Sequence, residues 1–144
     1  MCKRGAKVLP NVRPLNQNKY QISKYRFLEI YNFCLQYNEW KDELKYNTHT
    51  VGAQEITGMP FGTEKSDGTA HLAMKRAELE RKCQLIEQTA MEADSEIYPY
   101  ILKAVTNEHV GYNYLQTIMD IPCSRNTFYD RRRKFYYLMS MKKI

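Results

Sequence analysis

The fold of the C-terminal third is decided by residues 111–140, which read GYNYLQTIMDIPCSRNTFYDRRRKFYYLMS. Apolar side chains recur at helical spacing after Gly111, so we predict a short helix whose buried face is formed by Tyr112, Leu115, Ile118 and Met119. Pro122 should end it, because proline cannot donate to a continuing helix and biases the residue before it toward extended geometry. Ser124 is a good N-cap, and a second helix is therefore predicted from Arg125 to Met139.

This second predicted helix has two faces. A step of about 100° per residue gives one apolar stripe for docking, formed by Phe128, Phe135 and Met139 with Leu138 at its edge. The opposite stripe holds Asn126, Asp130, Arg133 and Tyr137, with Tyr129 and Lys134 beside it. Such a polar face suits the major groove of DNA, where Asn pairs with adenine and Arg with guanine.

The other charged residues of this predicted helix are expected to have two different roles. Arg125, Arg131 and Arg132 are predicted at its flanks, where arginines contact phosphates and fix the register on the duplex. Asp130 repels phosphate but can accept from a cytosine amino group, which indicates selectivity. A short helix, a tight turn and a basic helix form the order of a helix-turn-helix, and double-stranded DNA is the predicted partner. The alternative is an amphipathic helix with a merely solvated basic face.

Charge is distributed unevenly along the chain, whose formal net charge is +6. Residues 1–19 hold five basic and no acidic residues, residues 20–123 hold ten basic and fifteen acidic, and residues 124–144 hold seven basic and one acidic. A basic arm and a basic helix on an acidic body are typical of nucleic-acid binders. Further contacts with the DNA backbone are predicted for Lys3, Arg4, Lys7, Lys142 and Lys143. A solubilising terminus is the alternative for the arm.

Two long helices are predicted upstream. From Ser23, apolar residues repeat at 3-4 spacing through Leu44, and a second seam from about Ala70 includes Leu72, Leu79, Cys83, Ile86, Ala90 and Ala93. These helices should pack as a hairpin or pair with a second copy of the chain. Between them, residues 47–69 are rich in Gly and Thr and lack a sustained period, which predicts an irregular loop.

The predicted fold class is thus all-α, with two long helices forming a hairpin or dimer seam and a C-terminal helix-turn-helix. Residues 1–20 are assigned to a basic flexible arm, residues 21–93 to the helical hairpin, and residues 94–144 to the DNA-binding domain. A short helix in this domain should cover Tyr100 to Val105, with Pro99 in its first turn and Asp94 or Ser95 as its cap.

Several other classes of protein find no support. The chain has no run of about 18 apolar residues and no signal-peptide pattern, so we expect a soluble protein in the cytoplasm. The four cysteines are scattered and the three histidines show no ligand spacing, which predicts neither a metal site nor disulfides. No cluster of acids or of His and Asn stands at a catalytic spacing, so we expect no enzyme and no cofactor.

Four segments carry a resemblance to known proteins: residues 84–90 (QLIEQTA), 98–102 (YPYIL), 121–123 (IPC) and 128–135 (FYDRRRKF). Together with Tyr114-Leu115, they look like small proteins of phages and prophages of Gram-positive bacteria. The chain resembles the ArpU/RinA-type late transcriptional regulators, whose C-terminal part is similar to the last helix-turn-helix of a sigma factor.

The resemblance implies a phage-encoded regulator that binds specific double-stranded DNA in a bacterial host and contacts the host RNA polymerase. We further expect a homodimer, because paired seams bury more apolar surface and a two-fold dimer matches a palindromic site. The alternative comes from another class: an anti-CRISPR-like phage inhibitor that binds a host defence nuclease through the acidic helices.

Overall fold

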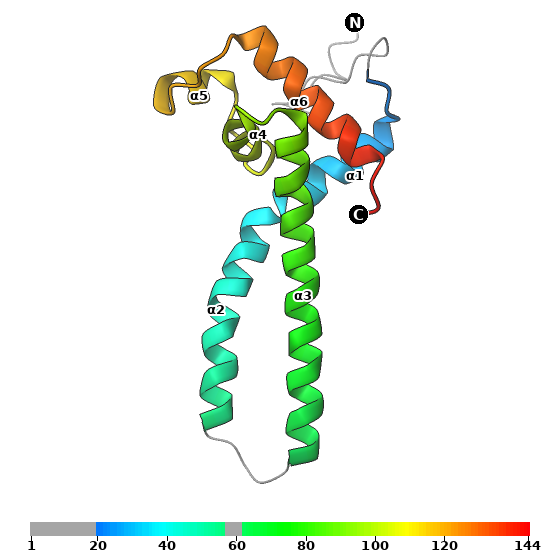
Figure 1. Cartoon of the computed structure of the whole chain (residues 1–144), viewed down its shortest axis with the longest axis vertical. Coiled ribbons are helices and arrows are strands. Elements are labelled where there is room, and N and C mark those ends of the chain that lie inside the picture. The colour runs from blue at the N-terminus through cyan, green and yellow to red at the C-terminus, as the bar shows by residue number, and fades with distance from the viewer. Residues whose placement is uncertain (1–19, 57–61) are drawn as a thin grey trace, which may run out of the picture. The chain divides into compact units, whose positions relative to one another are not determined.

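A computed structural model describes residues 20–56 and 62–144, where all regular structure is helical (Figure 1). The helices are α1 (Lys24–Leu35), α2 (Tyr37–Ile56), α3 (Gly62–Ala93), α4 (Tyr98–Val105), α5 (Tyr112–Ile118) and α6 (Arg125–Ser140). The predicted all-α class is therefore confirmed. The arm residues Lys3, Arg4 and Lys7 lie outside the described ranges.

The chain divides into two compact units, and the division differs from the predicted one. Unit 1 combines residues 1–35 with 86–144, and unit 2 spans residues 36–85. The sequence predicted one helix across Gln36, but α1 ends at Leu35 and packs against α6 and α4 of unit 1. Neither proline nor glycine stands near Gln36, so the break comes from tertiary packing and had no local signal.

Unit 1 is built around α6. One face of this helix is buried, and it packs against α1 and α4. The predicted docking residues Phe128, Phe135 and Met139 are all in the core, which confirms that stripe. In addition, the Tyr136 ring meets the Phe27 ring of α1 edge to face, with 4.9 Å between centroids, a favourable aromatic geometry.

The C-terminal end of α6 is fastened to α1 and α3 by polar contacts. Arg26 Nη2 donates to the carbonyl oxygens of Ser140 (3.1 Å) and Lys142 (2.8 Å). These bonds satisfy acceptors that a helix end or the chain beyond it would otherwise leave free. Lys142 Nζ in turn donates to Thr89 Oγ1 and Glu92 Oε1, both at 2.8 Å.

The turn between α5 and α6 follows the predicted chemistry. Ser124 Oγ accepts from the Thr127 amide at 3.2 Å, as expected of an N-cap, and α6 begins at Arg125. The chain reverses at Asp120, whose φ of 55° lies in the left-handed region that Asp tolerates better than most residues.

One predicted core residue of α5 is on the surface. Tyr112 and Leu115 are buried, but Ile118 is 64% exposed. The Ile121 amide donates to the Leu115 carbonyl at 3.1 Å, and the buried Ile121 side chain lies in the core instead of Ile118. The prediction for Ile118 was wrong because the helix ends there and the chain folds back.

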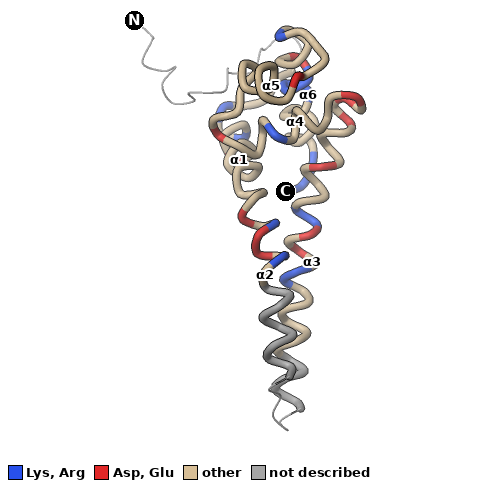
Figure 2. The backbone as a smooth tube through the Cα atoms, turned by 90° about the vertical axis from the view of Figure 1, so that its left-hand side faces the viewer, with Lys and Arg blue, Asp and Glu red and all other residues tan. Residues whose placement is uncertain are grey.

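Unit 2 pairs α2 with the first part of α3. Lys75 Nζ lies 3.0 Å from Glu43 Oε2, and the Lys82 ammonium lies 5.1 Å from the centre of the buried Trp40 ring. Leu79 and Cys83 are buried as the predicted seam requires. Charges of both signs alternate along the described parts of the two helices (Figure 2).

The irregular loop predicted at 47–69 is wrong for most of its length. Residues 47–56 continue α2 and residues 62–69 belong to α3, whereas residues 57–61 lie outside the described ranges. Glycine and threonine cost a helix only about 1 kcal/mol or less per residue, so their abundance did not exclude helices. Pro60, the strongest helix breaker in this segment, falls between α2 and α3.

The packing of α6 gives a first prediction. Phe135→Ala should lower the free energy of unfolding by about 3–5 kcal/mol, because it removes a fully buried aromatic ring and leaves a cavity. Ile118→Ala is the matched control and should change it by no more than about 0.5 kcal/mol. Urea denaturation followed by circular dichroism measures both. Equal losses in the two variants would contradict the assigned burial.

Candidate nucleic-acid interface

The N-terminal ends of α5 and α6 are joined at the surface. Arg125 Nη2 donates to Asn113 Oδ1 at 2.7 Å, and the guanidinium lies 5.0 Å from the centre of the Tyr112 ring. The Tyr112 hydroxyl donates to the Cys123 carbonyl at 2.6 Å. Two contacts thus fix Arg125, the first residue of α6, against α5, and a third fixes Cys123 in the turn before it. Arg125 and Asn113 stay exposed.

Four predicted reading residues share one face of α6. Asn126, Tyr129, Asp130 and Arg133 are spaced i, i+3, i+4 and i+7, which places them side by side on a helix. Asn126 is exposed and the other three are half-buried. None of the four is among the buried residues of α6.

The next positions continue this surface. Lys134 and Tyr137 are half-buried, and the Tyr137 ring lies 5.5 Å from the ring of Tyr20. Arg133 and Lys134 form no ion pair with another residue in the described ranges. These two cations are therefore not committed to holding unit 1 together.

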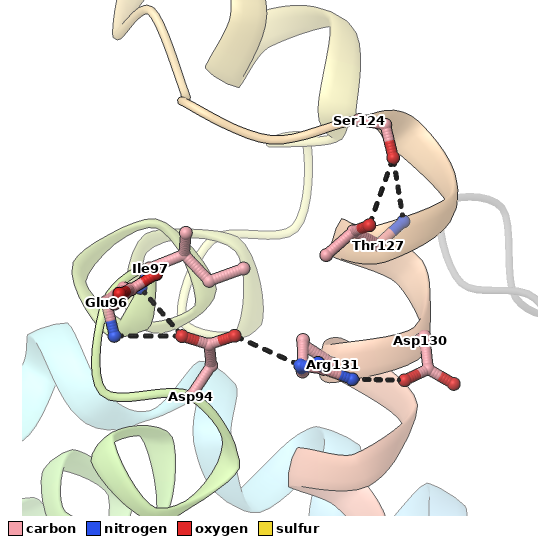
Figure 3. Close-up of polar contacts among 7 residues, drawn as sticks. All are labelled: Asp94, Glu96, Ile97, Ser124, Thr127, Asp130 and Arg131. Atoms are coloured by element: carbon pink, nitrogen blue, oxygen red, sulfur yellow. Dashed lines mark hydrogen bonds and ion pairs between the residues drawn. The ribbon is translucent and has the colours of Figure 1, made fainter.

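Arg131, by contrast, belongs to a polar clamp (Figure 3). Its Nε donates to Asp94 Oδ2 at 3.0 Å and its Nη1 to Asp130 Oδ2 at 2.6 Å. Asp94 Oδ1 accepts from the amides of Glu96 (2.8 Å) and Ile97 (3.1 Å) just before α4. The clamp joins α6 to the α3–α4 connection, and the predicted contact of Arg131 with a DNA phosphate stays a prediction. Asp130 likewise has a partner within the chain.

The structure places Arg132 differently from the prediction. The sequence placed it at the flank of the helix, but it is only 4% exposed. It lies one turn after Phe128 and one turn before Tyr136, and its guanidinium is 5.6 Å from the Phe128 ring centre and 4.7 Å from that of Tyr129. The long arginine side chain follows the docking stripe into the core, so its predicted position at the flank of the helix is wrong.

The two C-terminal lysines have different places. Lys142 Nζ donates to Thr89 and Glu92 of α3, and its predicted contact with the DNA backbone stays a prediction. Lys143 is exposed, and its predicted contact with the DNA backbone also stays a prediction.

The contacts of two residues in this region were not predicted from the sequence. Asn113 supports Arg125 across the turn, and Asp94 supports Arg131 from 37 positions away. An Asn one residue into a helix and an Asp before a helix are common surface residues, so neither carried a local signal. The sequence predicts Asp94 only as a cap, a role that its two bonds to backbone amides fulfil.

The pKa of Asp94 reflects these contacts. Burial opposes its charged form, but the hydrogen bonds from the Glu96 and Ile97 amides and from Arg131 outweigh burial and hold the pKa below its ordinary value of 3.8.

Two other features were sought in the described part of the chain, a metal site and a membrane-spanning helix. No group of three or more His, Cys, Asp or Glu side chains there is placed to hold a metal ion. No helix in these ranges is long and apolar enough to cross a membrane. Comparison of the chain with known protein families, with curated proteins and with solved structures finds no match.

The clamp gives a second prediction. Because the pKa of Asp94 is lower in the folded state, its charge stabilises the fold above the ordinary pKa, and this stability is lost as the pH falls through the folded pKa. In wild-type protein the free energy of unfolding should therefore fall on acidification below about pH 5. Asp94→Asn should weaken that dependence and lower stability at pH 7, as urea denaturation across pH would show. Glu96→Gln, at an exposed neighbour, should keep the wild-type dependence; an unchanged pH profile in Asp94→Asn would contradict the clamp.

Proposed function

We propose that α5, the turn at 119–124 and α6 act as a helix-turn-helix that binds specific double-stranded DNA. The observation that carries this proposal is the fixed junction of Arg125 with Asn113, next to the outer face of α6. The fold uses the opposite face of α6 for its core. The N-terminal part of a recognition helix contacts base edges in the major groove, and this part of α6 is the one held in place by α5.

The residues divide into two roles under this proposal. Asn126 and Arg133 read bases, because Asn is suited to adenine and Arg to guanine. Arg125, Lys134 and Lys143 contact phosphates and set the register. Tyr129 and Tyr137 border the reading face. Arg131 and Lys142 pair with acidic residues of the chain, and Arg132 lies against aromatic rings. The described part of the chain therefore offers fewer phosphate contacts than its number of basic residues suggests.

The biological role rests on the resemblance to ArpU/RinA-type regulators. We infer a transcriptional regulator of phage genes in a bacterial cytoplasm, acting by binding alone and without a cofactor. Contact with host RNA polymerase would turn DNA binding into activation. An inhibitor of a host defence nuclease is the competing function, and it requires no duplex binding by α6.

Variants of two neighbouring arginines test the proposal. Arg133→Ala should leave the melting temperature near that of the wild type and cost about 1–3 kcal/mol of binding, mainly on the preferred duplex. Arg131→Ala should lower the melting temperature by breaking the clamp, but leave the preference between duplexes unchanged. The preferred duplex is first selected from a pool of genomic fragments, and affinities are compared with a scrambled duplex by fluorescence anisotropy.

The dependence of DNA affinity on salt concentration measures the number of phosphate contacts. Each contact contributes about −0.9 to the slope of log K against log salt, so Arg125, Lys134 and Lys143 predict a slope of at least about −3 per chain, and the predicted contacts of Lys3, Arg4 and Lys7 would steepen it. Lys134→Ala should make the slope shallower by about 1 on both duplexes. No duplex binding at low salt, or equal loss on both duplexes for Arg133→Ala, would contradict base reading by α6; the first result would favour the nuclease inhibitor.

We also propose that the protein binds DNA as a homodimer, because a two-fold assembly matches a palindromic site with half-sites about one helical turn apart. Sedimentation equilibrium at tens of micromolar should give twice the mass of the chain, 17.1 kDa. A monomer, alone and on a duplex with two half-sites, would contradict this assembly.

A further inference from the structure

The described part of the chain begins at Tyr20, and this residue lies against α6. The centre of the Tyr20 ring is 5.5 Å from the centre of the Tyr137 ring, and the two ring planes are tilted by 44°. Aromatic rings at this separation attract one another. Both tyrosines are half-buried, so the contact lies at the surface of unit 1.

Tyr137 stands at one end of the proposed reading face of α6. It lies four residues after Arg133 and eleven after Asn126, and these spacings keep the three residues on one side of the helix. At about 1.5 Å of rise per residue, Tyr137 is about 6 Å along the helix from Arg133. Tyr20 is therefore held about one turn beyond a residue that is proposed to read a base.

A second contact fixes the same segment. Arg26, in the first turn of α1, donates from Nη2 to the carbonyl oxygens of Ser140 (3.1 Å) and Lys142 (2.8 Å). Tyr20 and Arg26 are only six residues apart, and both hold on to the C-terminal part of α6 or the residues just after it. The point at which residues 1–19 join unit 1 is thus fixed beside the reading face.

The residues before Tyr20 are strongly basic. Nineteen extended residues span at most about 65 Å, whereas half a turn of B-DNA is about 17 Å long. Cations joined to the chain at Tyr20 are therefore within reach of phosphates on either side of a site read by α6. Residues 1–19 contain no acid and five cations: Lys3, Arg4, Lys7, Arg13 and Lys19.

We propose that Tyr20 and Tyr137 form a positioning pair, which holds the basic residues 1–19 beside the DNA phosphates that flank the site read by α6. The inference rests on the DNA binding proposed above and adds flanking DNA to the surface that the protein binds. The cations supply affinity by releasing counterions from phosphates, without reading sequence. The aromatic pair decides where along the duplex these cations act.

Two duplexes that carry the selected site test the inference with the full-length protein. One duplex ends at the edges of the site, and the other continues for about ten base pairs, one helical turn, on each side. A variant with all five cations of residues 1–19 changed to Gln removes the proposed phosphate contacts. Its slope of log K against log salt should be shallower than that of the wild type by at least about 2 on the longer duplex, which corresponds to two contacts. On the shorter duplex the slope should stay the same.

The aromatic pair is tested by variants that keep the five cations. Tyr20→Ala should weaken binding of the longer duplex roughly two- to tenfold, the range expected for loss of one aromatic pair, and leave binding of the shorter duplex unchanged. Tyr20→Phe should bind as the wild type does, because the ring is retained. Tyr25→Ala, at a tyrosine of α1 that is 76% exposed, is the matched control and should change neither affinity.

A double variant separates positioning from a structural role. When the five cations are already changed to Gln, Tyr20→Ala should cause no further loss on the longer duplex, because no cation is left to position. A further loss in this background, or equal weakening of both duplexes by Tyr20→Ala alone, would make Tyr20 a structural residue of unit 1 and overturn the inference.

The response to salt distinguishes the two proposals. Specific binding of the longer duplex with a slope that changes by less than about 2 in the five-residue variant would overturn this inference and leave base reading by α6 standing. If the five-residue variant also melts at a lower temperature without DNA, the cations contact acidic residues of the protein instead. Absence of specific binding by the wild type to either duplex would overturn both proposals.

Discussion

The burial of one face of α6 against α1 and α4 is the constraint on which the rest of unit 1 depends. The edge-to-face contact of Tyr136 with Phe27 and the bonds from Arg26 to the carbonyls of Ser140 and Lys142 fix this helix along its C-terminal half. At its other end, Ser124 caps the helix. With both ends and one face fixed, the opposite face is presented in a set orientation, which is what recognition of a DNA groove requires.

The same constraint divides a run of four basic residues. Successive positions on a helix differ by about 100°, so residues 131–134 point in different directions. Arg131 reaches Asp94, Arg132 enters the core, and Arg133 and Lys134 remain outside these interactions. The basic character of the sequence thus overstates the charge offered to a partner, and part of it stabilises the fold.

Local chemistry could be predicted from the sequence, and distant packing could not. The start of α6 followed from Ser124, because capping depends on residues within one turn. The burial of Arg132 could have been predicted from spacing, because Arg132 lies four residues after Phe128 and three before Phe135, which places it within about 40° of the docking stripe. The break at Gln36 and the pairing of Asp94 with Arg131 depend on segments far apart in the sequence. The sequence underestimates the length of α2 and α3, because glycine and threonine are weak helix formers that are also typical of loops.

The most direct test of α6 as a reading helix is amide chemical-shift mapping by NMR of the full chain, titrated with a duplex selected from genomic fragments. We predict the largest changes at Asn113, Arg125, Asn126 and Arg133, with small changes along residues 37–46 and 68–85. Changes confined to those segments of α2 and α3, or absent from the N-terminal half of α6, would contradict it.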